Sequence, residues 1–402
     1  MSADSVKTAS RTLRIVVTGG GSGGHITPLL AVADELKILR PNCEIIYIGQ
    51  IGDSLGDVPA RHPSIDAVYT VRAGKLRRYH GEGLRQILDL QTTARNLRDV
   101  GYVTAGIGQS VRLLRRLRPD VVFVKGGFVG VPVGLAAAKL GIPYITHDSD
   151  AIPGLANRII ARWAARHAVA LPAEVYAYPP AKTVTVGVPI ARQFHDLGIS
   201  ELTTARQAVG LLADQRALLV TGGGLGARRL NDAVVAIAPE LLKRYPELVL
   251  FHLSGRGLEG EATHQYDNSV DASLRDRVRV IGFTDHLADY SAVADVVVMR
   301  ASATTIAEFA AQSKACIVVP NPLLTGGHQT KNAQLLAARQ AVRVVEEPLL
   351  QQDPRALLPV VREMLEDARL RKQLGERLHA MAHPESAREL AMLLLEQAEI
   401  RH

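Results

Sequence analysis

The stretch that decides the fold is LRIVVTGGGSGGHITPLLAVADEL, residues 13–36. Its apolar, β-branched run Leu13–Thr18 predicts a strand, and the glycine-rich segment Gly19–Gly24 predicts a turn. Apolar residues with helical spacing follow, and we place Pro28 in the first turn of that helix, where its missing N–H costs nothing. A second strand is predicted at Glu44–Ile48, so a βαβ unit opens the chain.

The same alternation continues along the chain. In the first half we expect strands and helices in turn at Asp120–Val124, Leu135–Leu140, Tyr144–His147 and Leu155–Arg166. After a break near Pro189 the pattern restarts as strand, glycine turn and helix at Ala217–Thr221, Gly222–Gly226 and Ala227–Ile237. Later strands are expected at Leu248–Leu253, Val278–Ile281, Val296–Met299 and Cys316–Val319. This alternation favours an α/β fold with two Rossmann-like, doubly wound domains that face a cleft.

The 402 residues are enough for two or three domains. We divide them into a first domain at 12–195 and a second at 196–384, each opened by a glycine turn. Residues 353–402 are expected to be helical throughout, with Pro384 as an interruption. Periodicity leaves open whether the last helix, about 385–402, packs back on the first domain.

Composition excludes several classes of protein. Hydrophobic residues make up 47% and charged residues 22%, so the chain can fill more than one core. Two cysteines are too few for a disulfide scaffold or a cysteine-rich metal site. We find neither a secretory-type leader nor an apolar run long enough for a spanning helix, and we expect a cytoplasmic protein that is soluble or peripheral to a membrane.

The net charge of +7 is concentrated in the first half of the chain. Two basic clusters contribute, namely Lys75, Arg77, Arg78 and Arg85, and then Arg112, Arg115, Arg116 and Arg118. Aromatic residues are only 4%, and the arginines accompany no nucleic-acid motif, so we expect no nucleic-acid partner. An anionic membrane surface or a polyanionic small substrate fits better, although the second cluster could equally be a solvated helix face.

The two glycine turns carry the first chemical signal. Glycines between a strand and a helix let backbone N–H groups approach a phosphate at the helix N-terminus. A nicotinamide enzyme would also need an acidic residue at the end of the second strand to hold a ribose. This chain has Gly49 and Gln50 there, which disfavours an oxidoreductase. His25 follows the first turn, where the positive end of the helix dipole favours a neutral, basic imidazole. The alternative is a histidine that only caps its helix.

A second signal lies between residues 300 and 308, RASATTIAE, directly after a predicted strand. Hydroxyl side chains and free N–H groups at a helix start can hold phosphate, and Glu308 one turn on can hold ribose hydroxyls. The alternative is a simple helix cap. Asp148 and Asp150 spell the D-x-D signature of metal-dependent glycosyltransferases, but those belong to a different fold, and we expect no metal here.

Taken together, the motifs resemble the MurG-type glycosyltransferases of bacterial peptidoglycan synthesis. The matching segments of the first half are GGSGGH (20–25) with Pro28, GKLRRY (74–79), GGFV (126–129) with Pro132, LGIP (140–143) and GLANR (154–158). Those of the second half are Gly222-Gly223, Gly226-Ala227-Arg228 with Asn231, ATTIAE (303–308) and HQ-x-x-NA (328–333). Their order and spacing cover roughly residues 13 to 345.

This resemblance implies the GT-B fold and an inverting transfer of N-acetylglucosamine. The donor would be UDP-N-acetylglucosamine, and the acceptor would be the 4-hydroxyl of undecaprenyl-pyrophosphoryl-N-acetylmuramoyl-pentapeptide, so that lipid I becomes lipid II. The enzyme would need no cofactor and would lie peripherally on the cytoplasmic face of the cell membrane. Its first domain would dock on the anionic leaflet through the region of Lys75, Arg77 and Arg78.

The resemblance also assigns roles to residues. His25 becomes the candidate general base or a residue of the acceptor site, and Ser22, Gly23 and Gly24 lie near the acceptor pyrophosphate or the donor sugar. The helix start that stabilises the diphosphate in place of a metal is formed by Ala303, Thr304, Thr305, Ile306 and Ala307. Glu308 would hold the ribose, Thr284 would flank the uracil, and Gln329 would contact the sugar.

Three segments depart from the family pattern. The family's His-Glu-Gln-Asn loop is here His147-Asp148-Ser149-Asp150, so a carboxylate, which cannot donate a hydrogen bond, replaces an amide expected at the donor sugar. Gly224 stands where a serine is usual. The family arginine falls at Ala191, and we transfer its role to Arg192. Two alternatives to this function remain open. One is a transferase that uses another UDP-sugar or lipid acceptor, and the other is a non-catalytic protein that binds a nucleotide sugar.

Overall fold

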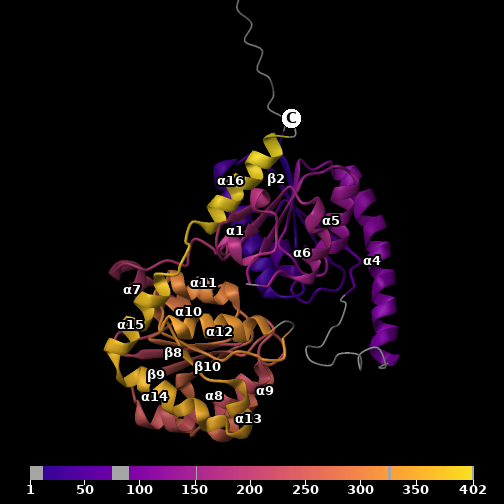
Figure 1. Ribbon diagram of the computed structural model, residues 1–402. Helices are drawn as coiled ribbons and strands as arrows, with labels where there is room; N and C mark the ends of the chain where they lie inside the picture. The colour runs from indigo at the N-terminus through magenta and orange to yellow at the C-terminus, as the bar shows by residue number, and fades with distance from the viewer. Residues whose placement is uncertain (1–11, 75–89, 151, 325–326, 401–402) are drawn as a thin grey trace, which may run out of the picture.

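The computed structural model describes residues 12–74, 90–150, 152–324 and 327–400 (Figure 1). Two lobes follow one another along the chain, each built on a sheet of parallel strands. In the first lobe the strand order is β3-β2-β1-β4-β5-β6-β7. The strands are β1 (Arg14–Thr18), β2 (Glu44–Gln50), β3 (Ala67–Val71), β4 (Val121–Val124), β5 (Tyr144–Asp148), β6 (Arg166–Val169) and β7 (Thr183–Thr185).

Helices cover both faces of this first sheet. They are α1 (Gly23–Leu39), α2 (Asp57–Arg61), α4 (Leu90–Leu117), α5 (Gly130–Lys139) and α6 (Leu155–Ile160), with the short helices η1 (Ala161–Trp163), η2 (Ala173–Val175) and η3 (Pro180–Lys182). Because both faces are covered, the central strands are apolar along their whole length: every residue of β4 is buried.

The second lobe repeats the arrangement, with the strand order β10-β9-β8-β11-β12-β13. Its strands are β8 (Arg216–Thr221), β9 (Leu248–Leu253), β10 (Val278–Ile281), β11 (Val296–Met299), β12 (Cys316–Val318) and β13 (Arg343–Val344). Its helices are α7 (Ile199–Ala208), α8 (Arg228–Arg244), α9 (Glu259–Ser269), η4 (Ala272–Arg277), α10 (Leu287–Val293), α11 (Ala303–Ala311), α12 (His328–Ala338), α13 (Glu347–Gln352), η6 (Pro354–Leu357), α14 (Leu358–Glu366) and α15 (Ala368–His379). The last helix, α16 (Ser386–Glu399), packs on the first lobe.

These strand orders confirm two doubly wound α/β units. In each sheet the order reverses beside the first strand, between β1 and β4 and again between β8 and β11. At such a switch point the neighbouring connections leave to opposite faces, and a crevice opens beyond the carboxyl ends of the strands. The fold therefore places a binding crevice next to each glycine turn.

Helix α16 returns from the second lobe to the first, where Figure 1 shows it lying along α1. Its apolar residues Leu390 and Leu394 are fully buried in one core with Ile15 and Leu36. The division of the chain at residues 195 and 384 remains our proposal. The last helix completes the hydrophobic core of the first lobe.

The structure corrects the helix predicted at Leu155–Arg166. The helix ends at Ile160, and Arg166–Val169 instead forms β6 beside β5. Of the residues predicted as helix, Ala161–Trp163 form the short helix η1, and only Arg166 belongs to β6, which is fixed by its pairing with β5. The strands β3, β7 and β13 are also additional to those that the sequence predicted.

Two further predictions, the place of Pro28 in its helix and the continuous helix at the C-terminus, are also corrected by the structure. Helix α1 begins at Gly23, so Pro28 lies inside it rather than in its first turn. A proline there cannot donate to the carbonyl four residues earlier, which belongs to Gly24. The segment predicted as helical throughout consists of separate helices, with non-helical residues at 380–385 around Pro384.

We predict that Leu394→Ala lowers the free energy of unfolding by about 2–5 kcal/mol, the usual cost of such a cavity in a core. Met392 on the same helix is 46% exposed and makes a matched control, so Met392→Ala should have little effect. Urea unfolding of both variants measures the difference. Equal, small effects would contradict the packing of α16 into the first lobe.

Candidate functional site

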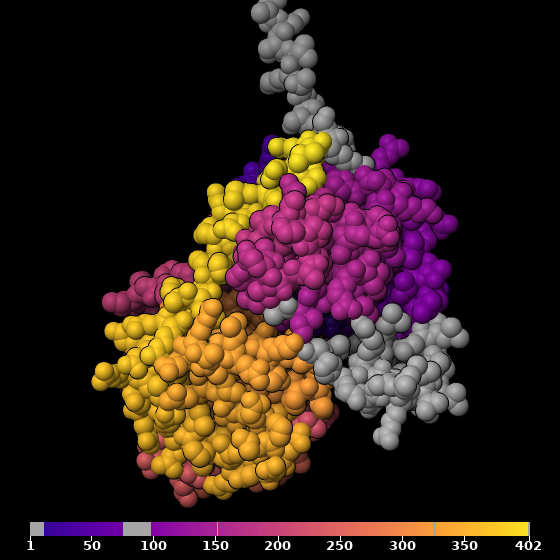
Figure 2. All heavy atoms as spheres, in the orientation of Figure 1, coloured from indigo at the N-terminus to yellow at the C-terminus, as the bar shows by residue number. Residues whose placement is uncertain are grey.

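A cleft of about 1920 Å³ lies between the lobes, and both switch points open into it. Figure 2 shows the two lobes in contact around it. Its lining includes the turn after β1, the ends of β4 and β5, the turn after β8 and the start of α11. Sites at the carboxyl ends of parallel strands are typical of doubly wound folds.

In the first lobe the glycine turn after β1 packs closely against Gly126 and Gly127, which follow β4. The residue at position 127 has φ +74°, and a Cβ there would lie 2.7 Å from the carbonyl oxygen of Gly20, so only glycine fits. The turn after β1 is held by the neighbouring strand β2, because Tyr47 Oη donates to the carbonyl of Gly19 at 2.5 Å. Asp53 accepts from the amide of Gly21 at 2.8 Å.

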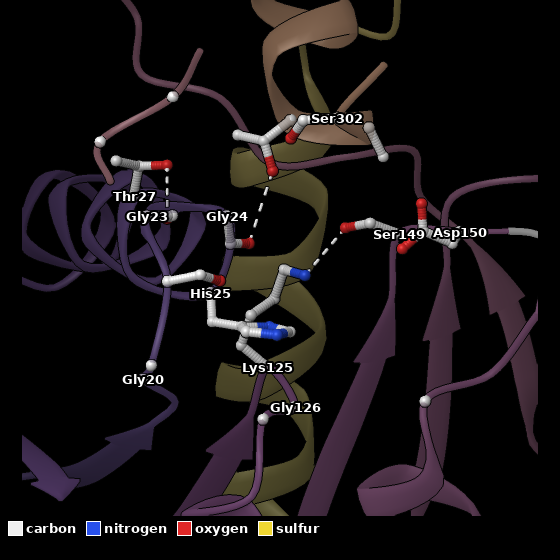
Figure 3. Close-up of a pocket in the computed structure, with 18 of the residues that line it drawn as sticks. Gly20, Gly23, Gly24, His25, Thr27, Lys125, Gly126, Ser149, Asp150 and Ser302 are labelled. Carbon is white, nitrogen blue, oxygen red and sulfur yellow. Dashed lines mark hydrogen bonds between the residues drawn. The ribbon is translucent and has the colours of Figure 1, made fainter. Parts of the chain in front are cut away.

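His25 lies in the first turn of α1 with its ring beside Gly126 and Gly127 (Figure 3). The pKa of His25 is lowered to about 3, mainly by burial and to a lesser extent by the charges of Lys125 and His328. Among the described residues no group hydrogen-bonds its Nδ1 atom. The imidazole that lines the cleft is therefore neutral in the free protein, and only a neutral imidazole can accept a proton.

The loop after β5 closes the same end of the cleft. Asp148 accepts hydrogen bonds from Tyr178 Oη at 2.8 Å and from the amide of Gly154 at 3.0 Å. Burial raises the pKa of Asp148 despite these bonds. Asp150 accepts from Asn332 Nδ2 of α12 at 3.0 Å, across the cleft. Among the described residues no group of three or more His, Cys, Asp or Glu side chains is arranged to hold a metal ion.

In the second lobe the start of α11 points into the cleft. Ser302 has the extended backbone of an N-cap, and its carbonyl accepts from the amide of Ile306 at 2.9 Å. The amides of Ala303, Thr304 and Thr305 precede the first bond of the helix, so they can donate to an anion. The amide of Ile306 is already engaged within the helix.

Glu308 lies one turn further along α11 and is 6% exposed. Burial raises the pKa of Glu308 to about 8, so the carboxyl group is protonated at neutral pH in the free protein. A protonated carboxyl can both donate and accept a hydrogen bond. Gln329, at the start of α12, accepts from the amide of Asn321 at 2.9 Å, which fixes its amide group at the cleft wall.

The cleft brings together most of the residues that the sequence analysis selected. Those that line it are Ser22, Gly23, Gly24, His25, Asp150, Gly224, Thr284, Ala303, Thr304, Thr305, Glu308 and Gln329. Ile306 and Ala307 are not among the lining residues. Arg192 is also outside the lining, and its guanidinium pairs with the buried carboxylate of Glu35 on α1. Lys75, Arg77 and Arg78 lie outside the described residues.

Contacts between the lobes were not predicted from the sequence. Thr304 Oγ1 donates to the carbonyl of Gly24 at 3.4 Å, the carbonyl that Pro28 leaves without its helical partner. Arg256 donates to Asp57 Oδ1 at 2.7 Å and stacks over the ring of Phe283. The sequence analysis also did not single out Lys125, although a lysine directly after the wholly apolar β4 is a visible signal.

Comparisons with known proteins agree with this geometry. Residues 15–169 match the glycosyltransferase family 28 N-terminal domain, and residues 217–390 match the family 28 C-terminal domain. A curated relative from Natranaerobius thermophilus is 30% identical over 95% of this chain and 99% of its own length. Its name is UDP-N-acetylglucosamine--N-acetylmuramyl-(pentapeptide) pyrophosphoryl-undecaprenol N-acetylglucosamine transferase. This chain belongs to the MurG family of glycosyltransferases.

Further relatives support the assignment. A protein of the same name from Limosilactobacillus fermentum is 30% identical over 95% of this chain and 98% of its own length. The crystal structure of Acinetobacter baumannii MurG has a TM-score of 0.65 and 22% identity, with 96% of this chain and 99% of that chain covered. At that identity the crystal structure supports the fold, which is GT-B.

We predict that burial of Glu308 makes stability depend on pH. Because the pKa of Glu308 is raised from 4.5 to about 8, the folded state keeps a proton that the unfolded state loses, and stability falls as pH rises through that window. The melting temperature of Glu308→Gln minus that of the wild type should therefore increase by a few degrees from pH 5 to pH 8. The exposed Glu396→Gln is the control, and a pH-independent difference would refute the prediction.

Proposed function

We propose that this protein transfers N-acetylglucosamine from UDP-N-acetylglucosamine to the 4-hydroxyl of lipid I, with inversion at the anomeric carbon. The family relationship supports this reaction, and the strongest structural support is the composition of the cleft. A neutral histidine on the first lobe and an anion-binding helix start on the second lobe line a single cleft. An acceptor hydroxyl can thus meet a nucleotide-activated sugar between them.

In the proposed arrangement the second lobe holds the donor. The amides of Ala303, Thr304 and Thr305 bind the diphosphate, and Glu308 binds the ribose hydroxyls. Thr284 lies at the uracil end, while Gly224 lines the phosphate side and Gln329 faces the sugar. The helix start takes the place of a metal ion in stabilising the leaving UDP.

The first lobe holds the acceptor and the base. Ser22, Gly23 and Gly24 contact the acceptor pyrophosphate or the donor sugar. His25 takes the proton of the 4-hydroxyl while that oxygen bonds to the anomeric carbon and the bond from this carbon to the phosphate oxygen breaks. The negative charge of the bound substrates favours the imidazolium that forms, although burial lowers the pKa of His25 in the free protein to about 3.

The acceptor's lipid implies a membrane surface. We propose that the protein works peripherally at the cytoplasmic face of the cell membrane, with its first lobe toward the anionic leaflet and without a nucleic-acid partner. The net charge of +7 and the arginines of α4, Arg112, Arg115 and Arg116, support this proposal. Among the helices of the described residues, none is long and apolar enough to span a membrane.

One observation favours a second candidate, a transferase with a different UDP-sugar. Asp150 presents a carboxylate where an amide was expected, and that carboxylate is held by Asn332 at 3.0 Å. A carboxylate accepts hydrogen bonds but cannot donate them, so the hydroxyls it selects can differ. Comparing rates with several UDP-hexosamines distinguishes the two candidates.

The reaction is tested by incubating the purified protein with UDP-N-acetylglucosamine and a short-chain lipid I analogue in buffer containing EDTA. We expect UDP release that depends on the acceptor, together with a lipid product heavier by one N-acetylhexosamine. Tight UDP binding without release with this pair would contradict the proposed reaction and favour another substrate or a non-catalytic role.

We predict that His25→Ala lowers turnover at least about a hundredfold, because the acceptor hydroxyl loses its proton acceptor. The dissociation constant for UDP should stay unchanged, since UDP binds on the opposite lobe. The exposed His264→Ala is the control and should behave as wild type in both measurements. Unchanged turnover in His25→Ala would remove His25 from the role of general base.

A further inference from the structure

Lys125 is a buried cation at the switch point of the first sheet. It follows β4 directly, is 2% exposed and lines the cleft next to Gly126. A lysine is rarely buried to this extent unless it is paired or used for binding. The mechanism described above gives it no part.

The hydrogen bonds of Lys125 leave part of its ammonium group available. Its Nζ atom donates to Ser149 Oγ at 2.8 Å, and among the described residues no other acceptor and no directly paired carboxylate is found for it. An ammonium has three N–H donors, so two are left for a ligand in the cleft. Burial lowers the pKa of Lys125 to about 8, and the nearby charges of Asp150 and Asp148 oppose that shift, so the group is still mainly charged at neutral pH.

Lys125, Ser149 and Asp150 line one wall of the cleft, with Asp150 one residue beyond the serine that Lys125 contacts. Figure 3 shows the Lys125 side chain directed toward Ser149, with Asp150 beside that serine. One oxygen of Asp150, Oδ1, accepts from Asn332 of the second lobe. Its other lone pairs can accept from a ligand. The wall thus carries a donor and an acceptor at neighbouring positions.

The charge balance of this wall indicates what kind of group binds there. A phosphate would have to approach Lys125 against the carboxylates of Asp148 and Asp150, both of which act on it electrostatically. A neutral hydroxyl meets no such repulsion, and each hydroxyl both donates and accepts. A donor beside an acceptor suits the hydroxyls of a sugar.

We propose that Lys125 and Asp150 form a donor–acceptor pair that binds hydroxyls of the donor's hexosamine, with Lys125 as a specificity-determining residue. Lys125 supplies the hydrogen-bond donor that a carboxylate at position 150 lacks. The two residues together do the work of one amide, which carries a donor and an acceptor in a single group. This inference rests on the proposed function, because it assigns the sugar of that reaction to this wall.

The test compares Lys125→Met, Asp150→Asn and the double variant with wild type. Lys125→Met should raise KM for UDP-N-acetylglucosamine about tenfold or more, the scale of losing a charged hydrogen bond, with a smaller change in kcat. The inhibition constant of UDP, which lacks the hexosamine, should stay within about twofold. The preference for UDP-N-acetylglucosamine over its 4-epimer, UDP-N-acetylgalactosamine, should also shrink.

The double variant gives the sharpest result. The side-chain amide introduced by Asp150→Asn restores a donor, so combining Lys125→Met with Asp150→Asn should recover much of the lost affinity and epimer preference. Lys139→Met, at an exposed position on α5 of the same lobe, is the control and should match wild type. A melting curve for each variant reports folding, and Lys125→Leu, which also lacks a donor, replaces Lys125→Met if that variant unfolds.

Three results would overturn the inference. An unchanged KM and epimer preference in Lys125→Met would show that the ammonium does not touch the sugar. A parallel rise in the UDP inhibition constant would assign Lys125 to a phosphate. A lower melting temperature with unaltered epimer preference would make its role structural.

Failure of the proposed reaction is recognised separately, because it appears first in wild type as absent acceptor-dependent UDP release. The dissociation constants of UDP-N-acetylglucosamine and of UDP then test the pair without turnover. If Lys125→Met weakens the binding of UDP-N-acetylglucosamine and leaves that of UDP unchanged, the inference holds even where the acceptor has been misassigned. If both constants match wild type, the inference fails.

Discussion

The contact between Thr304 and the carbonyl of Gly24 joins two helix N-termini, those of α11 and α1, across one cleft. Each N-terminus carries a partial positive charge, so two of them face the same space. That arrangement is unfavourable when the cleft is empty and favourable when anions lie in it. The need to place two polyanionic substrates against each other accounts for the paired lobes and for the two glycine turns.

The same constraint accounts for the unusual protonation states of the cleft. Burial and the charge of Lys125 lower the pKa of His25, which keeps the imidazole neutral and able to accept a proton. Burial raises the pKa of Glu308, which keeps that carboxyl group neutral beside the site proposed for the diphosphate. Since neither group adds charge to the empty cleft, the amides that we propose to bind phosphate are not neutralised in advance.

Much of the fold could be predicted from local sequence. The central strands are apolar on both faces and the glycine turns follow them directly, so β1, β4, β8 and β11 were recognisable. The end of the helix near Ile160 was not, because the start of β6 is fixed by pairing with β5, which the local sequence does not show. The edge strands β7 and β13 are too short to give a pattern.

The site was predictable where its residues form one segment and unpredictable where distant segments meet. The start of α11 and the turn before α1 were found from their own sequences. The hydrogen bond between Asp150 and Asn332 joins residues 182 positions apart, and no local sequence pattern predicts it. Lys125 was missed for a related reason, since one charge after an apolar strand becomes meaningful only when its burial beside Ser149 is seen.

The central claim is that the donor diphosphate binds at the start of α11 and leaves the turn before α1 to the acceptor. A crystal structure of the protein with UDP-N-acetylglucosamine, grown in EDTA, tests this most directly. The account predicts phosphate oxygens within hydrogen-bond distance of the amides of Ala303–Thr305, with the sugar toward Lys125 and Asp150. A diphosphate bound instead at residues 19–24, or bound only after a metal is added, would contradict it.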